Sequence, residues 1–197
     1  MKTIADTATL TTPEYRQFIE DLKARVTAAR ISAARAVNRD LILLYWDLGR
    51  AILERQRTLG WGESVVEMVS ADLQRAFPGT TGFSPRNLRD MKRFYLAYAD
   101  RAIWPQAVAK LPRWAKTGEN EIWPQPVANL TEEEVIEFLL QLVAEIPWGH
   151  HRLILDKLTK PIARLYYLRA TARFGWSRNV LLNQIKAGAY ERAVEEI

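Results

Sequence analysis

The chain has 197 residues, of which 48% are hydrophobic and 26% are charged, and its formal net charge is +5. Those proportions are typical of a globular protein and exclude a disordered one. The sequence has no cysteine, which excludes disulfides, thiolate catalysis, iron–sulfur clusters and cysteine-ligated zinc. It also has no apolar run near the roughly 20 residues that span a bilayer. We therefore expect a cytoplasmic, bacterial-type protein with no membrane partner, and the positive charge favours nucleic acid as a ligand.

The first predicted helix follows a short N-terminal tail. Residues 1–12 have no apolar core, so they predict a flexible tail rather than a signal peptide. From Pro13 to about Arg57, apolar residues recur every three or four positions, as in an amphipathic helix. The run from Leu41 to Trp46 is apolar on all sides. We expect it to be a buried helix at the centre of the core, with a buried strand as the alternative.

Two more helices and a turn predict a helix-turn-helix-like unit over residues 63–98. The first helix is expected over 63–77, and residues 78–82 have the composition of a turn. The start of the second helix carries two signals. Ser84 can cap the helix, and Pro85 suits its first position.

The helix after Ser84 supplies most of the predicted nucleic-acid contacts. On a helical wheel its apolar residues share one side, which should pack on the core: Leu88, Met91, Tyr95 and Tyr98. Its arginines follow the spacing i, i+3 and i+7 on the other side: Arg86, Arg89 and Arg93. Asn87 could pair with adenine and Lys92 with a flanking phosphate, as residues of recognition helices do. The alternative is a solvated helix face on which Asp90 partly balances the arginines.

Residues 102–130 differ from the rest because a short Trp-Pro segment occurs twice. The segment Ile103–Ala109 recurs as Ile122–Ala128. Its prolines exclude one continuous helix, so we predict a linker or arm. Trp104 and Trp123 would then dock on this chain, on a second copy or on another protein.

A second helical region is predicted over residues 131–197, packed on residues 13–101 as one domain. Its last helix begins with Ser177, Arg178 and Asn179, which repeats the serine, arginine and asparagine of the earlier helix start. We therefore add Arg178 and Asn179 to the predicted nucleic-acid contacts. Because the chain has several helix–turn–helix units and no convincing strand pair, the predicted fold class is all-α.

A second basic stretch lies in this region, opposed only by Asp156: Arg152, Lys157, Lys160, Arg164, Arg169, Arg173 and Arg178. Beside the arginine-bearing helix it would complete a long electropositive groove, and binding would depend strongly on salt. The alternative is a set of scattered surface charges, because helical side chains point several ways.

No catalytic or metal-binding pattern is present in the sequence. His150 and His151 are adjacent, so on a helix they diverge by about 100° and are poorly placed to chelate one metal. The sequence has no Gly-rich phosphate loop, nucleophile elbow or zinc-protease motif. We therefore expect no metal, no cofactor and no enzymatic activity. An independent enzyme with His151 as a base is a much weaker alternative, and no reaction suggests itself.

Several blocks of the chain resemble the N-terminal domain of the YhcG-type family, bacterial proteins whose C-terminal half is a PD-(D/E)XK nuclease. In order, they cover most of residues 14–190: Leu44–Gly49, Gly60–Gly62, Leu73–Tyr98, Pro147–His151, Gly175–Arg178 and Gln184-Ile185. The resemblance implies a helical domain ahead of a nuclease, for substrate recognition or assembly. The Trp-Pro duplication departs from the pattern as an insertion. The nuclease half is not represented in these 197 residues, so nuclease activity is not expected of them.

The sequence thus predicts a non-catalytic domain that binds nucleic acid, DNA rather than RNA. The alternative is a protein-interaction or oligomerisation module that recruits or presents a nuclease, or that pairs with a second copy. In that alternative Trp104 and Trp123 would be interface anchors, since buried tryptophan is enriched at binding hot spots.

Overall fold

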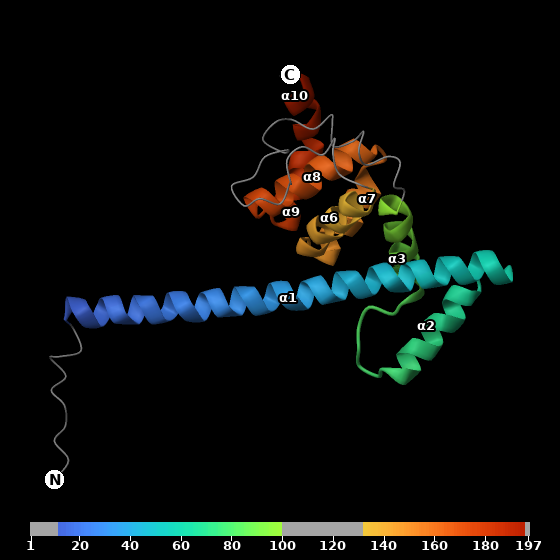
Figure 1. Cartoon of the computed structure of the whole chain (residues 1–197), viewed down its shortest axis with the longest axis horizontal. Coiled ribbons are helices and arrows are strands. Elements are labelled where there is room, and N and C mark those ends of the chain that lie inside the picture. The colour runs from blue at the N-terminus through green and yellow to red at the C-terminus, as the bar shows by residue number, and fades with distance from the viewer. Residues whose placement is uncertain (1–11, 100–131, 196–197) are drawn as a thin grey trace, which may run out of the picture. The chain divides into compact units, whose positions relative to one another are not determined.

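The computed structural model describes residues 12–99 and 132–195, and in these ranges the regular elements are all helices (Figure 1). Their bounds are α1 Pro13–Leu59, α2 Val65–Ala76, α3 Pro85–Tyr98, α6 Glu132–Glu145, α7 Trp148–Lys157, α8 Pro161–Phe174, α9 Arg178–Lys186 and α10 Ala189–Glu195. The all-α prediction is confirmed. The predicted tail except Thr12, and all of residues 102–130 with Trp104 and Trp123, lie outside the described residues. Within those ranges, no helix combines the length and apolar character that crossing a membrane requires.

The chain divides into two compact units, the first ending at Val37 and the second beginning at Asn38. The described part of the first unit is the N-terminal half of α1 and the residue before it. The second unit contains the rest of α1 and the helices α2 to α10, so it holds the core and the predicted nucleic-acid contacts.

The second half of α1 packs through one side only. Its buried residues are spaced by three and four positions: Ile42, Tyr45, Gly49 and Ile52. A Cβ at Gly49 would collide with the backbone oxygen of Met91, so α1 and α3 approach too closely for any side chain there. Leu41 and Leu44 are exposed, which corrects the expectation that the Leu41–Trp46 run is buried all round. A helix at the edge of a core buries one stripe, however apolar its other side is.

The predicted start of α3 is confirmed. The Ser84 hydroxyl accepts a hydrogen bond from the backbone N–H of Asn87 at 3.3 Å, and Pro85 occupies the first turn. The apolar side faces inward as predicted at Leu88, Met91 and Tyr98, while Tyr95 is half-buried. α2 and α3 are joined by the segment Phe77–Ser84. That connection is longer than the turn of about three to four residues in a helix-turn-helix motif, so the assignment to this motif stays a prediction.

Two clusters of buried side chains form the core, and α7 links them. The larger cluster consists mainly of residues from α6 to α9 together with Phe94 and Tyr98 of α3. The smaller one joins α1, α2 and α3 around Leu88 and Met91. Trp148, the first residue of α7, packs against both. Because α7 packs on α3, α8 and α9, it connects α3 to the helices near the C-terminal end of the described chain.

Candidate nucleic-acid interface

Most of the basic side of α3 is neutralised by carboxylates from other helices or from just before them. Arg89 forms an ion pair with Glu67 of α2. The Lys92 Nζ lies 2.9 Å from Glu63 Oε1, and the Arg93 guanidinium lies 2.8 Å from Asp156 Oδ1 of α7. Lys92 holds the pKa of the Glu63 carboxyl below its usual range through a hydrogen bond and its charge. These pairs connect α3 to its neighbours, and they leave Arg89, Lys92 and Arg93 with little uncompensated charge for a polyanion.

Asn87 and Lys92 are also buried, with 8% of each residue exposed. The Asn87 side chain donates a hydrogen bond to the Gly82 carbonyl at 2.6 Å, and its oxygen accepts one from Trp148 Nε1 at 2.7 Å. Both ends of the amide are therefore used inside the fold. The nucleic-acid contacts predicted for Asn87 and Lys92 stay predictions, and this geometry disfavours them.

Arg86 differs from the other cations of α3. It is exposed, and no carboxylate pairs with it among residues 12–99 and 132–195. It occupies the first turn of α3, next to Asn87. Through the bond between Asn87 and Trp148, this turn is joined to the first turn of α7.

Arg178 occupies the corresponding place at the start of α9. It is exposed, as is Asn179, and it too lacks a carboxylate partner in the part of the chain that the structure describes. Its Cδ would lie 3.8 Å from a Cβ at Gly149, in the first turn of α7. His150 Nε2 lies 2.9 Å from the Trp176 carbonyl oxygen and connects the same two turns. Three helix starts, those of α3, α7 and α9, therefore meet around Trp148 and Gly149. We call this place the three-start junction.

The local electrostatics of the three-start junction favour an anion. None of the three helices has an acidic residue in its first turn. The start of a helix carries unpaired amide N–H groups and the positive end of the helix dipole. Ser84 and Ser177 each cap one amide of their helices, whereas Pro147 gives α7 no side-chain cap. The first amides of α7, beside the small Gly149, are the ones that an anion could satisfy.

The two histidines of α7 serve the fold. His151 is fully buried, and its Nε2 lies 2.8 Å from the Val143 carbonyl. Burial lowers its pKa to about 4, so the ring is neutral near pH 7. Burial also lowers the pKa of His150. Among the described residues, no group of three or more His, Asp or Glu side chains could hold a metal ion.

The second basic stretch is split among different environments. Arg152 Nε lies 2.8 Å from Asp90 Oδ2, and Arg164 donates to the Leu158 carbonyl at 3.0 Å. Arg169 is buried, and desolvation lowers its pKa to about 10. Arg152 and Arg164 have partners within the fold, and Arg169 is buried in it. The contacts therefore do not support one continuous basic groove along residues 152–178.

Sequence reasoning missed the role of Trp148 and Gly149 as the centre of the three-start junction. The two residues were visible only as part of a block shared with the YhcG-type family. A tryptophan next to a glycine at a helix start does not by itself show which other helix starts surround it. The repeated serine, arginine and asparagine at residues 84–87 and 177–179 was the stronger signal.

Comparison with known proteins agrees with the resemblance seen in the sequence. The family model described as the DUF1016 N-terminal domain matches residues 21–119 and 129–192. The unmatched residues 120–128 contain the whole second Trp-Pro segment, in line with an insertion there. The Escherichia coli (strain K12) protein described as "Putative nuclease YhcG" is 27% identical over 188 residues.

That alignment covers 93% of this chain and 48% of the Escherichia coli protein, so the chain spans about half the length of its relative. No solved structure matches the chain significantly. Because the family model matches most of the residues, the chain belongs to the family of DUF1016 N-terminal domains.

Proposed function

We propose that this domain binds nucleic acid, DNA in preference to RNA, through phosphate groups held at the three-start junction. The observation that carries the proposal is the pair of exposed arginines, Arg86 and Arg178, on helix starts that flank the uncapped start of α7. We prefer this site to the arginine row of α3 as the contact surface, because Arg89 and Arg93 of that row have carboxylate partners.

The chemistry suits phosphate better than base edges. A phosphate at the start of α7 would accept hydrogen bonds from its first backbone amides, which no side chain caps. Arg178 beside it and Arg86 on the α3 side could each add a charge-assisted hydrogen bond. Phosphate contacts position a protein on nucleic acid without reading its sequence. We therefore expect weak sequence preference and strong dependence on salt.

Because the relative is described as a nuclease, we expect the binding to serve nuclease action. A domain that holds the phosphate backbone would keep nucleic acid near a nuclease domain, whether that domain is in the same polypeptide or in a partner. The domain itself would then be non-catalytic, and it would supply affinity rather than chemistry.

The proposal is tested by binding of a fluorescent duplex of about 20 base pairs to the 197-residue chain at several salt concentrations. The double variant R86Q/R178Q should bind at least about 10-fold more weakly near 100 mM salt. Since each lost phosphate contact removes roughly one counterion, the slope of log K against log salt should flatten by about 2. Single-stranded DNA and duplex RNA of the same length measure the preference between ligands.

The matched control is R57Q/R75Q, which removes the same charge from the ends of α1 and α2. Its affinity should fall by less than about twofold if local contacts rather than net charge govern binding. Equal losses in the two double variants, or no binding of any nucleic acid at low salt, would reject the three-start junction as the site.

A further inference from the structure

The N-terminal half of α1 exposes a long apolar stripe to solvent. From Pro13 to Val37 every residue is exposed except Ile19, which is half-buried. Leu22 is 38% exposed and Val26 is 58% exposed, although both are large and apolar. Scattered apolar residues on a surface need no explanation, but a continuous row of them marks an interaction site.

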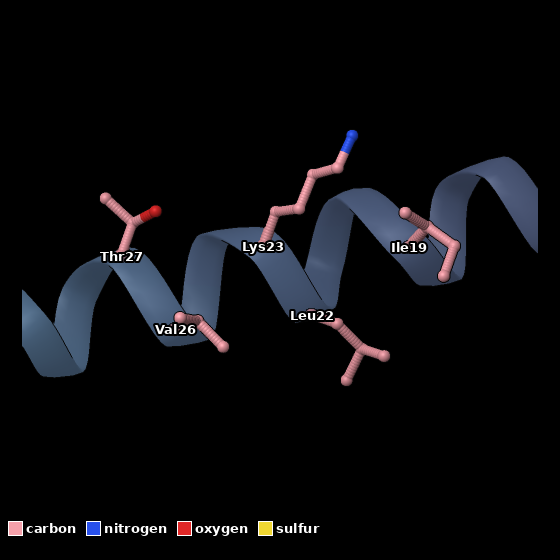
Figure 2. A pocket seen from close by; sticks show the side chains of 5 residues that line it. All are labelled: Ile19, Leu22, Lys23, Val26 and Thr27. Atoms are coloured by element: carbon pink, nitrogen blue, oxygen red, sulfur yellow. The ribbon is translucent and has the colours of Figure 1, made fainter.

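The row has the spacing of a coiled coil. Apolar residues alternate at intervals of four and three positions through Tyr15, Ile19, Leu22, Val26, Ala29, Ala33 and Ala36. This is the heptad pattern in which one side of a helix contacts a second helix along its length. Figure 2 shows Leu22 and Val26 on one side of the helix and Lys23 and Thr27 on another. Ile19, Leu22 and Val26 line an open hollow with those two neighbours.

Such a helix gains little stability alone. Isolated helices are marginal in water, and most helical stability in proteins comes from packing of the apolar side. Within the first unit no described residue buries this row, whereas the second half of the same helix buries Ile42 and Ile52 in the core of the second unit. A second helix along the row would remove its apolar surface from water.

The charges beside the row indicate what kind of helix fits. On one flank lie Arg16, Lys23 and Arg30, each one position after a residue of the row, and Arg25 lies on the other flank. Lys23 also pairs with Glu20 on the open surface. No acidic residue occurs from Leu22 to Arg39. The flanks of the row are therefore basic.

Basic flanks disfavour a second copy of this chain. In a parallel pair of identical helices, Arg25 of one copy would face Arg30 of the other. In an antiparallel pair, Arg16, Lys23 and Arg30 would face one another. Like charges at these flanking positions select against a partner, whereas opposite charges select for it.

We infer that residues 15–36 form one strand of a heterotypic coiled coil whose partner is a helix with an apolar seam and acidic flanks. This inference is independent of the nucleic-acid proposal. It uses the first unit of the chain, whereas the three-start junction lies in the second.

The test measures binding of two fluorescent designed peptides of about 28 residues to the 197-residue chain by anisotropy. Both peptides have the same leucine and isoleucine seam, and their flanking positions are all glutamate in one and all lysine in the other. The acidic peptide should bind at least about 10-fold more tightly. Added salt should weaken its binding, because the selecting interaction is between charges.

Variants of the chain locate the contact. L22K/V26K should weaken binding of the acidic peptide at least about 10-fold. A24K/A28K adds the same charge on the opposite side of α1 and should leave affinity within about twofold. R86Q/R178Q should also bind the peptide normally, which separates this inference from the nucleic-acid proposal. Circular dichroism checks that each variant remains helical.

Two results would overturn the inference. One is equal binding, or no binding, of the acidic and lysine peptides. The other is light scattering that shows the chain alone as a dimer and L22K/V26K as a monomer, since the occupant of the row would then be a second copy.

Discussion

The starts of α3 and α9 share a serine, an arginine and an asparagine, yet the fold uses them differently. Ser84 and Ser177 both cap their helices, and Arg86 and Arg178 are both exposed. Asn87 is buried and bonded on both sides of its amide, whereas Asn179 is exposed.

The difference between the two asparagines arises from their positions in the first turn. Pro85 lies between the cap and the arginine of α3, so Asn87 is the third residue after Ser84, on the side of the buried Leu88. Asn179 is only the second residue after Ser177. One added residue turns a side chain by about 100° on a helix, which moves it from solvent to the core.

The largest expected effect concerns His151 of α7, the helix that joins the two starts. Its folded pKa of about 4 lies below the ordinary 6.5, because burial penalises the charged ring. The unfolded chain gains a proton as pH falls through 6.5, and the folded chain gains one only near pH 4. The free energy of unfolding should therefore fall over this window, by about 2 kcal/mol between pH 7 and pH 5.

Urea denaturation of the chain and of H151Q at both pH values measures this contribution. Glutamine keeps a hydrogen-bond donor for the Val143 carbonyl and does not titrate in this range. The variant should lose about 2 kcal/mol less than the original chain on acidification. An identical loss in both proteins would mean that His151 is protonated equally in the folded and unfolded states.

The two asparagines give the next largest difference. N87A removes the acceptor of Trp148 Nε1 and the donor to the Gly82 carbonyl, so it should lower the free energy of unfolding by about 2 kcal/mol. N179A changes an exposed residue and should stay within about 0.5 kcal/mol. Urea denaturation at pH 7 measures both. Equal effects would contradict the distinction between a buried and an exposed asparagine.

The two serine caps should give the smallest difference. Each hydroxyl accepts one amide hydrogen bond, at 3.3 Å for Ser84 and 3.4 Å for Ser177. S84A and S177A should each cost about 0.5–1 kcal/mol, because loss of a cap exposes one unpaired amide. Thermal melts followed by circular dichroism provide the measurement. A much larger loss for one variant would show that the two starts differ in their caps as well as in their asparagines.

Local sequence determined the helical character of the second unit and the starts of two of its helices, but not the division of the last predicted helix into α9 and α10. Ser84 with Pro85, and Ser177, are cap signals that act within one turn, so they hold wherever the helix packs. The apolar spacing of α3 likewise predicted that Leu88, Met91 and Tyr98 face inward. The exposed state of Arg86, Arg178 and Asn179 also agrees with their predicted place at the surface.

Tertiary structure alone decided which cations keep their charge uncompensated. A helical wheel gives the direction of Arg89 and Arg93, but not that Glu67 of α2 and Asp156 of α7 lie opposite them. Those carboxylates are distant in sequence and come near only when the helices pack. For the same reason no local pattern could join the start of α7 to the starts of α3 and α9. Side-chain direction depends on nearby residues of the same helix, whereas the partner that a charge meets depends on the packing of distant ones.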